Sequence, residues 1–362
     1  MITFERVTRR YGGRAAVDAL DMVIPAGEIV ILVGPSGCGK TTSMRMINRM
    51  IEPTSGTLTV DGSDVGKTDP VKLRLGIGYV IQSAGLMPHQ RVIDNVATVP
   101  VLKGQSRRAA RKAALDVLER VGLDRKLATR YPAQLSGGQQ QRVGVARALA
   151  ADPPILLLDE PFSAVDPVVR EELQAEMMRL QNELHKTIVF VTHDIDEAVK
   201  LGDKVAVFGP GGTLQQYDPP ARLLSNPAND FVAGFIGADR GYRALQFIHA
   251  TGLPLHNIRR ATEVDTLNLA DGEWVLVCRS DGSPFGWIDA AGVRRHRDGG
   301  SLHDSIMAGG SLFHPDDTLR QALDSALSSP SGVGVAVEAD GKVIGGVRAD
   351  DVLGALEAQR RA

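Results

Sequence analysis

Short apolar runs alternate with helical patterns over the first two thirds of the chain. The apolar runs have the length of buried strands and occupy residues 28–33, 77–82, 155–158 and 187–192. The helical patterns occupy residues 40–50, 106–121, 137–151 and 194–201. This alternation predicts an α/β fold with a largely parallel sheet, interrupted by a helical subdomain at about residues 85–150.

Two of these helices carry further sequence marks. The helix at residues 106–121 has helically spaced apolar positions at Ala110, Ala114, Val117 and Val121. The helix at residues 194–201 is expected to begin at the N-cap Asp194 and to end before Gly202.

The last third of the chain contains a faint internal repeat. Residues 281–293 and 340–352 align at an offset of 59 and share aspartate, glycine, alanine and valine positions. Strand-like runs precede both copies, at residues 274–278 and 333–337. The long period favours two small paired α/β modules over a solenoid, although chance similarity between short glycine-containing segments is the alternative. The pattern changes near residues 231–240, which predicts a domain boundary there.

Length and composition narrow the class of protein. At about 150 residues per domain, 362 residues suggest two to three domains. The chain has 41 Lys and Arg against 43 Asp and Glu, so its formal net charge of −2 does not indicate nucleic-acid binding. Its two cysteines, Cys38 and Cys278, exclude a disulfide scaffold and fit a reducing compartment. The charged N-terminal segment and the lack of an apolar run of about 18 residues predict that any membrane role comes through a partner.

A phosphate-binding motif lies between the first predicted strand and its helix. Residues 34–41 match G-x-x-x-x-G-K-[ST], in which backbone N–H groups surround phosphate oxygens. Lys40 is expected to reach the β and γ phosphates, and Thr41 to offer a hydroxyl to Mg²⁺. A glycine turn before an ordinary helix is the alternative. The candidate nucleotide-binding residues are Gly34, Pro35, Ser36, Gly37, Cys38, Gly39, Lys40, Thr41 and Thr42.

Cys38 lies inside this motif, next to the start of a predicted helix. The positive end of a helix can lower the pKa of a thiol. We therefore expect Cys38 to be alkylated, with loss of activity, and bound nucleotide to protect it.

Two carboxylates follow the apolar run at residues 155–158. Ligands collect at the carboxyl ends of strands in such sheets. Asp159 is therefore a candidate for holding Mg²⁺, and Glu160 is the candidate catalytic base that orients the attacking water. A solvated acidic turn is the alternative interpretation of this pair.

A second anion-binding helix start lies at residues 135–142, where a hydroxyl and two glycines precede a helix. With the phosphate-binding motif, this LSGGQ segment resembles the ATP-hydrolysing subunits of ABC transporters. The resemblance covers residues 1–238 and implies a P-loop NTPase cassette with two ATP sites in a head-to-tail homodimer. In that family the segment closes over ATP held by the other subunit. Here its residues are Ser136, Gly137, Gly138 and Gln139.

Four further positions match the family's motifs. Tyr11 resembles the aromatic residue that stacks on adenine, and Gln82 resembles the catalytic glutamine that contacts Mg²⁺ and water. Asp166 resembles the aspartate of the interface loop, and His193 resembles the catalytic histidine that contacts the γ-phosphate. A packed surface tyrosine, a polar strand end, a helix cap and a structural histidine are the respective alternatives. The implied cofactors are ATP and Mg²⁺.

The type of ABC protein follows from what accompanies the cassette. The chain shows one cassette, no inserted coiled coil and no fused membrane helices, which favours an importer subunit. Residues 44–56 and 77–89 are similar to the subunits that energise uptake of glycine betaine, carnitine, choline and proline. This implies transmembrane permease subunits, an indirect extracytoplasmic solute-binding protein, and a place at the cytoplasmic face of the membrane. An importer of another small polar solute, or a non-transport ABC ATPase, is the alternative.

Residues 83–100 lie where importer cassettes form the groove for a permease helix, with Leu86 and Met87 as apolar candidates. Packing of both side chains inside the helical subdomain is the alternative.

Residues 239–362 resemble the paired CBS modules that end such importer subunits, a smaller α/β domain for regulation or dimerisation. Arg348 and Asp289 replace the hydroxyl often used to bind an adenosine nucleotide. The second copy keeps a carboxylate at Asp351, whereas the first has Gly292. Nucleotide sensing and support of a dimer both stay open. A small basic cluster, Arg294, Arg295 and Arg297, is a candidate sensor of salt or anionic lipid, with a solvated charge run as the alternative.

Overall fold

The computed structural model describes residues 1–82, 85–163 and 165–361. The chain divides into two compact units, Met1–Gly237 and Ala238–Ala362. Ser83 and Ala84, at the start of the predicted permease groove, and Ala164, in the predicted interface loop, lie outside the described residues. None of the helices in the described part of the chain is long and apolar enough to cross a membrane.

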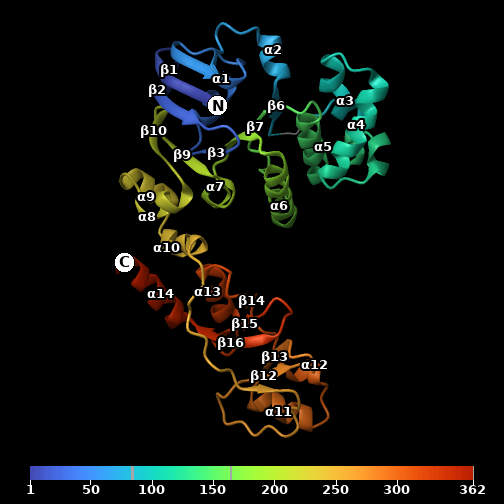
Figure 1. Ribbon diagram of the computed structural model, residues 1–362, viewed down its shortest axis with the longest axis vertical. Coiled ribbons are helices and arrows are strands. Elements are labelled where there is room, and N and C mark those ends of the chain that lie inside the picture. Colours follow the sequence, from blue (N-terminus) through green and yellow to red (C-terminus); the bar gives the residue numbers. More distant parts are fainter. Residues whose placement is uncertain (83–84, 164, 362) are drawn as a thin grey trace. The chain divides into compact units, whose positions relative to one another are not determined.

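A six-stranded sheet forms the centre of the first unit (Figure 1). Its strands are β3 (Ile29–Val33), β6 (Ile77–Val80), β7 (Ile155–Asp159), β8 (Thr187–Val191), β9 (Lys204–Gly209) and β10 (Thr213–Asp218). In the order β10-β9-β3-β8-β7-β6, all neighbours are parallel except β10 and β9. β3, β7 and β8 are buried at every position, as continuous apolar runs require of central strands. The predicted α/β fold with a largely parallel sheet is confirmed.

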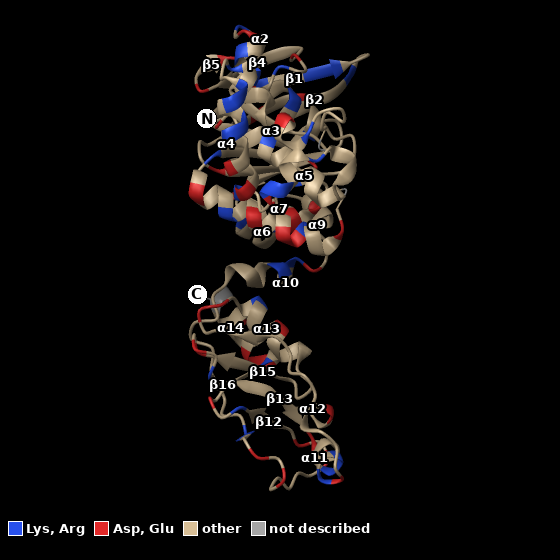
Figure 2. Cartoon of the chain, turned by 90° about the vertical axis from the view of Figure 1, so that its right-hand side faces the viewer, with Lys and Arg blue, Asp and Glu red and all other residues tan. Residues whose placement is uncertain are grey.

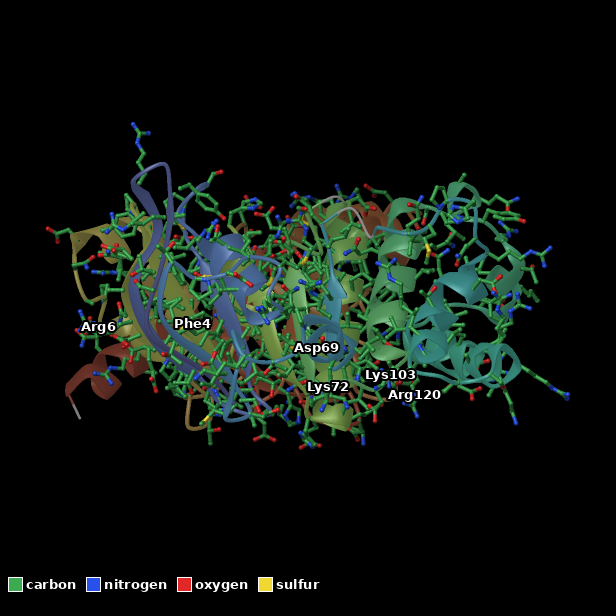
Figure 3. All side chains as sticks on the ribbon, turned by 90° about the horizontal axis from the view of Figure 1, so that it is seen from above. Phe4, Arg6, Asp69, Lys72, Lys103 and Arg120 are labelled. Atoms are coloured by element: carbon green, nitrogen blue, oxygen red, sulfur yellow. The ribbon has the colours of Figure 1, made fainter. Side chains whose placement is uncertain are left out.

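A second sheet, which the sequence analysis did not anticipate, is antiparallel in the order β2-β1-β4-β5. Its strands are β1 (Ile2–Tyr11), β2 (Arg14–Ile24), β4 (Ser55–Val60) and β5 (Ser63–Asp64). One hydrophobic core joins the two sheets: Phe4 of β1 and Leu20 of β2 belong to the same cluster as Val191 of β8. Figure 3 labels Phe4 within this sheet.

The helical subdomain has its own core. It contains α3 (Val92–Leu102), α4 (Arg107–Arg120) and α5 (Gly137–Leu149), joined by the short 3₁₀ helices η1 (Arg125–Thr129) and η2 (Pro132–Gln134). Ser106 begins α4, because its hydroxyl accepts from the backbone N–H of Ala109. Leu118 is fully buried, whereas Val117, which we expected on the apolar face, is half-buried. The fully buried positions are therefore Ala110, Ala114, Leu118 and Val121, and Val117 packs in part against the same core.

The other helices of the first unit are α1 (Lys40–Ile47), α2 (Pro70–Leu75), α6 (Pro167–Leu184), α7 (Ile195–Leu201), α8 (Pro220–Ser225) and α9 (Asp230–Ile236). At the start of α2, the Asp69 carboxylate accepts from the backbone N–H of Lys72, and Figure 3 labels both residues. Asp194 caps α7 as expected, by accepting from the N–H groups of Asp196 and Glu197.

The second unit contains two three-stranded sheets of the same topology. Their strands are β11 (Arg260–Ala261), β12 (Val275–Cys278) and β13 (Pro284–Ile288), then β14 (Leu312–Phe313), β15 (Val333–Val337) and β16 (Val343–Arg348). In each sheet the first pair is parallel and the second antiparallel. The helices are α10 (Arg240–Ala244), η3 (Leu245–Phe247), α11 (Ala290–Arg297), α12 (Leu302–Ser305), α13 (Leu319–Ser328) and α14 (Ala349–Arg361). One helix, α11 or α14, follows each antiparallel pair.

Candidate functional site

The phosphate-loop residues occupy the turn between β3 and α1, where two glycines have no substitute. Gly34 has a φ of 149°, and a Cβ there would collide with the carbonyl oxygen of Phe208. Gly39 has a φ of 93°, and its Cβ would collide with the carbonyl oxygen of Ala16. Both positions need the conformational freedom and the small size of glycine. The chain therefore passes close to its neighbours here and brings backbone N–H groups to the start of α1.

The Lys40 side chain is folded back over this loop. Its ammonium group donates to the carbonyl oxygens of Gly34, at 2.7 Å, and Pro35, at 2.8 Å. Lys40 is only 6% exposed. The ammonium group also donates to Cys38 Sγ at 3.7 Å, so all three of its donors are used inside the loop, the third in a long and weak contact.

Asp159, at the end of β7, is held from both carboxylate oxygens. The Thr41 hydroxyl donates to Oδ1 at 3.0 Å, and the Tyr79 hydroxyl donates to Oδ2 at 3.4 Å. The Arg45 guanidinium also lies 3.5 Å from Oδ2. Burial raises the pKa of Tyr79, which keeps its hydroxyl a donor. The sequence analysis did not predict that Tyr79 and Arg45 contact Asp159. In the sequence they stand out only as a tyrosine in an apolar strand and an arginine in the helix after the phosphate loop.

Glu160 is the centre of a second group of side chains. Its backbone is left-handed, with a φ of 46°, a conformation that non-glycine residues adopt rarely. The Gln82 amide donates to Glu160 Oε2 at 3.3 Å, and His193 Nδ1 lies 3.4 Å from the same oxygen. Gln82 also donates to the Ser163 hydroxyl at 3.3 Å, a contact that sequence reasoning did not anticipate.

A cavity of about 340 Å³ opens between the phosphate loop and these side chains. It is lined by Ser36, Gly37, Cys38, Gly39, Lys40, Thr41, Thr42, Glu160 and His193. The structure thus brings together most of the predicted phosphate-loop residues and two of the predicted catalytic residues, from distant parts of the sequence.

The remaining predicted residues lie outside the described lining of this cavity. Tyr11 is 47% exposed, with the Arg9 guanidinium 4.4 Å from its ring centroid. Ser136 and Gln139 cap α5 reciprocally, because each side chain accepts from the other's backbone N–H. Asp166 caps α6 by accepting from the N–H of Val169 at 3.1 Å, which was the alternative interpretation of this residue.

The expected lowering of the Cys38 pKa is wrong. Burial raises the pKa of this thiol, although Lys40 opposes the shift from 3.7 Å. Cys38 is 3% exposed, so desolvation of the thiolate outweighs the nearby positive charge and the start of α1.

Comparison with known proteins defines the class. The profile of the family described as "ABC transporter" matches residues 17–163. The osmoprotectant import ATP-binding protein OsmV of Salmonella typhimurium is 38% identical, over 99% of this chain and 97% of that protein. The chain therefore belongs to the ABC transporter family, as one of its ATP-binding proteins, and the predicted family is confirmed.

Two further relatives are more similar over a shorter part of the chain. The carnitine transport ATP-binding protein OpuCA of Listeria monocytogenes is 52% identical over 66% of this chain. The glycine betaine uptake system ATP-binding protein YehX of Escherichia coli is 47% identical over 68% of this chain and 80% of that protein. The chain spans only 60% of the length of OpuCA.

Solved structures confirm the predicted cassette fold. The post-hydrolysis dimer of the ATP-binding cassette MJ0796 with ADP and Pi is 34% identical, with a TM-score of 0.56, and the match covers 61% of this chain and 99% of that one. The structure of cbiO1 from Clostridium perfringens is 29% identical, with a TM-score of 0.58, over 63% of this chain and 91% of that one.

Proposed function

We propose that the chain binds and hydrolyses ATP with Mg²⁺, as the energising subunit of an importer for osmoprotectants such as glycine betaine, carnitine, choline or proline. The ATPase activity rests on one observation: the phosphate loop, Glu160 and His193 line a single cavity. The solute class rests on the printed functions of the relatives, which include osmoprotectant, carnitine and glycine betaine transport.

The residues around Asp159 fit Mg²⁺. The Thr41 hydroxyl and the Asp159 carboxylate supply oxygen donors 3.0 Å apart, the ligand type that Mg²⁺ prefers. Gln82 adds an amide oxygen as a candidate ligand. Bound there, the ion would neutralise charge on the phosphates. Tyr79 and Arg45 contact Oδ2 of Asp159, and Thr41 contacts Oδ1.

Each side chain of the cavity has a proposed task. The Lys40 ammonium contacts the β and γ phosphates in place of its long contact with Cys38 Sγ, beside the backbone N–H groups of the loop. Glu160 orients the attacking water and accepts its proton, because its carboxylate lines the cavity beside the phosphate loop. Gln82 and His193 fix the position of Glu160 Oε2, and His193 also contacts the γ-phosphate. Tyr11 stacks on adenine through the ring face opposite Arg9.

A second copy of the chain completes each site. We propose that residues 136–139 and Asp166 contact the nucleotide of the partner in a head-to-tail homodimer. Because Ser136 and Gln139 already cap α5, the segment keeps its shape before the partner arrives. The dimeric MJ0796 cassette supports this proposal.

The helical subdomain offers a docking place for permease subunits. A cavity of about 420 Å³ there is lined by residues that include Arg91, Asp94, Leu102 and Tyr131. Leu102 and Tyr131 are exposed, at 66% and 42%. Leu86 packs in part against the helical core, which favours the internal alternative for this side chain. Through the permease, the chain would lie at the cytoplasmic face of the membrane and act indirectly with an extracytoplasmic solute-binding protein. No nucleic-acid partner is proposed.

Two experiments test this function against its alternatives. Co-purification with two membrane permease subunits would exclude a non-transport ABC ATPase. Uptake of labelled glycine betaine, carnitine, choline and proline by the reconstituted complex would identify the solute. If the complex takes up none of these four solutes in an ATP-dependent manner, its substrate is another small polar solute.

Alkylation of Cys38 should inactivate ATP hydrolysis slowly at neutral pH and faster as the pH rises. The thiolate is the reactive form, and the raised pKa keeps it scarce near neutrality. Residual ATPase activity after timed maleimide exposure measures this, and bound ATP should protect. Cys38→Ser should stay active and resistant, whereas inhibition that persists in this variant would point to another site.

We propose that residues 239–362 form a pair of CBS-like modules that supports the dimer. The two sheets of identical topology favour a paired module. Asp351, the candidate ribose ligand, already accepts from the N–H of Arg348 at 2.8 Å and lies 2.9 Å from His256 Nε2. These contacts occupy Oδ2, which argues against Asp351 as a ribose ligand.

The basic cluster on α11 is smaller than its sequence indicates. Figure 2 shows Lys and Arg gathered at this helix. The Arg297 guanidinium donates to the carbonyl oxygens of Asp265 and Leu267, so it holds a loop of its own unit. Arg294 lies 3.9 Å from the Asp271 carboxylate, and both it and Arg295 are exposed, so these two are the members to test as a salt or lipid sensor.

Truncation after Ala238 should leave ATP hydrolysis within about twofold of the full chain when both are assayed at protein concentrations at which the cassettes dimerise, because the cassette forms its own compact unit.

Transport in anionic liposomes, measured against salt, tests the sensor. If Arg294 and Arg295 contact anionic lipid, Arg294/Arg295→Ala should activate at lower salt, since screening acts over about 8–10 Å near physiological ionic strength. Identical salt profiles for the full chain and both variants would reject the sensor and retain dimer support.

A further inference from the structure

Three buried polar side chains connect the end of β8 to the middle of α6. Thr192, Glu197 and Gln174 are 2%, 7% and 4% exposed. The Thr192 hydroxyl donates to Glu197 Oε2 at 2.7 Å, and the Gln174 amide donates to Oε1 at 3.4 Å. The Lys200 ammonium donates in turn to Gln174 Oε1 at 2.9 Å. Both carboxylate oxygens of Glu197 are thus used inside the protein.

One end of this network lies beside His193. Thr192 immediately precedes His193, and the backbone N–H of Thr192 donates to the carbonyl oxygen of Leu32 in β3. Asp194 follows it, caps α7 and lies 3.7 Å from the Arg170 guanidinium. Both neighbours of His193 are therefore anchored, while its own side chain is 63% exposed toward the cavity.

The other end of the network is the face of α6 that begins at Asp166. Asp166, Arg170 and Gln174 are spaced by four residues, so they follow one side of the helix. Arg170 contacts Asp194, and Gln174 contacts Glu197. The helix that starts at the proposed interface residue therefore makes two side-chain contacts with the segment that carries His193.

Burying the Glu197 carboxylate costs desolvation free energy. Burial raises the pKa of Glu197, against the donation from Thr192. An apolar side chain of similar volume would pack there without desolvating a charge. Directional hydrogen bonds are what Glu197 provides and leucine would not, and they fix α6 and the end of β8 at one relative position.

We propose that Glu197, with Thr192 and Gln174, is a positioning unit that sets the orientation of His193 according to the position of α6 and Asp166. The inference rests on the proposed roles of His193 and Asp166. Its consequence is a link between the two ATP sites of the dimer: contact of Asp166 with the partner changes the placement of His193 in its own subunit. None of the three belongs to the described lining of the cavity, so they would act through His193.

Steady-state ATP hydrolysis by full-length variants, with permease subunits where turnover requires them, tests the proposal. Thr192→Val and Gln174→Met should each lower kcat by about tenfold or more with little change in the KM for ATP, because small displacements of a catalytic group have large effects on rate. Thr192→Ser keeps the hydroxyl and should retain kcat.

The chain offers matched controls for loss of stability. Thr187 lies at the other end of β8, and its hydroxyl accepts from the N–H of Gly27 at 3.0 Å. Gln181 lies on α6, and its amide donates to the carbonyl oxygens of Gly27 and Lys186. Thr187→Val and Gln181→Met should also lower the melting temperature, yet leave kcat within about twofold, since they remove hydrogen bonds that buried side chains make with Gly27 and Lys186 rather than with the segment carrying His193.

A His193→Ala background separates coupling from general damage. If the network acts through His193, Thr192→Val should not lower the single-turnover rate of His193→Ala further. An equal loss in both backgrounds, or an unchanged kcat for Thr192→Val and Gln174→Met, would overturn the positioning unit. Wild-type turnover by His193→Ala would instead refute the proposed role of His193 itself, so the two failures are distinguishable.

Discussion

Glu160→Gln should lower kcat for ATP hydrolysis by about 10²–10⁴-fold, because a positioned general base contributes about that much. The amide keeps the size of the side chain and the reach to Gln82 and His193, but it cannot accept a proton from water. The phosphate loop is untouched, so ATP should still bind with similar affinity. Because hydrolysis no longer reopens the dimer, the variant should accumulate as an ATP-bound dimer in size-exclusion chromatography.

Glu160→Gln has a suitable matched control on the same chain. Glu172 pairs with Arg142 at an exposed position of α6. Glu172→Gln should keep wild-type turnover, since exposed ion pairs contribute little. Rapid multiple-turnover hydrolysis by Glu160→Gln would remove Glu160 from its proposed role.

Lys40→Ala should weaken ATP binding itself, in contrast to Glu160→Gln. A hydrogen bond to a charged group contributes about 1.5–3 kcal/mol, so the Kd for ATP should rise by about 10- to 100-fold. The variant also leaves the carbonyl oxygens of Gly34 and Pro35 without their ammonium partner, which loosens the loop. Equilibrium binding of a fluorescent ATP analogue measures the change, and an unaltered Kd would contradict the phosphate-loop assignment.

Mixing Lys40→Ala with Ser136→Arg tests whether each site uses both subunits. The arginine of Ser136→Arg would block the γ-phosphate of the partner and leave ATP binding to the monomer intact. In a mixed dimer, one composite site carries both substitutions and the other carries neither. Recovery of ATPase activity on mixing is expected. Heterodimers that form without any recovery would contradict the proposed contribution of Ser136 in trans.

Contiguous motifs made much of the site predictable. In the phosphate loop, neighbouring residues form the structure with one another, so the glycines and the following helix define its shape locally. The strand before Asp159 and the cap at Asp194 are predictable for the same reason. The parallel sheet follows from alternating apolar runs, whose carboxyl ends meet at one edge.

Long-range contacts were harder to predict because no local pattern contains them. Tyr79 and Arg45 meet Asp159 only after three elements have packed together. The network of Thr192, Glu197 and Gln174 likewise joins residues from separate elements. The antiparallel sheet was missed because register shifts interrupt the regular alternation of β1, and its partner β4 lies far from it in the sequence.

The sequence by itself predicted the family, the phosphate loop and the catalytic candidates, because each motif consists of residues close together in the chain. It also predicted the division into a cassette and a smaller unit. Only the tertiary structure decided how deeply each group is buried and what it faces. Cys38 shows the difference: its neighbours in sequence favour a low pKa, but desolvation in the packed loop raises it. Burial is a property of the whole fold, and it changes the free energy of the charged form of each titratable group that it desolvates.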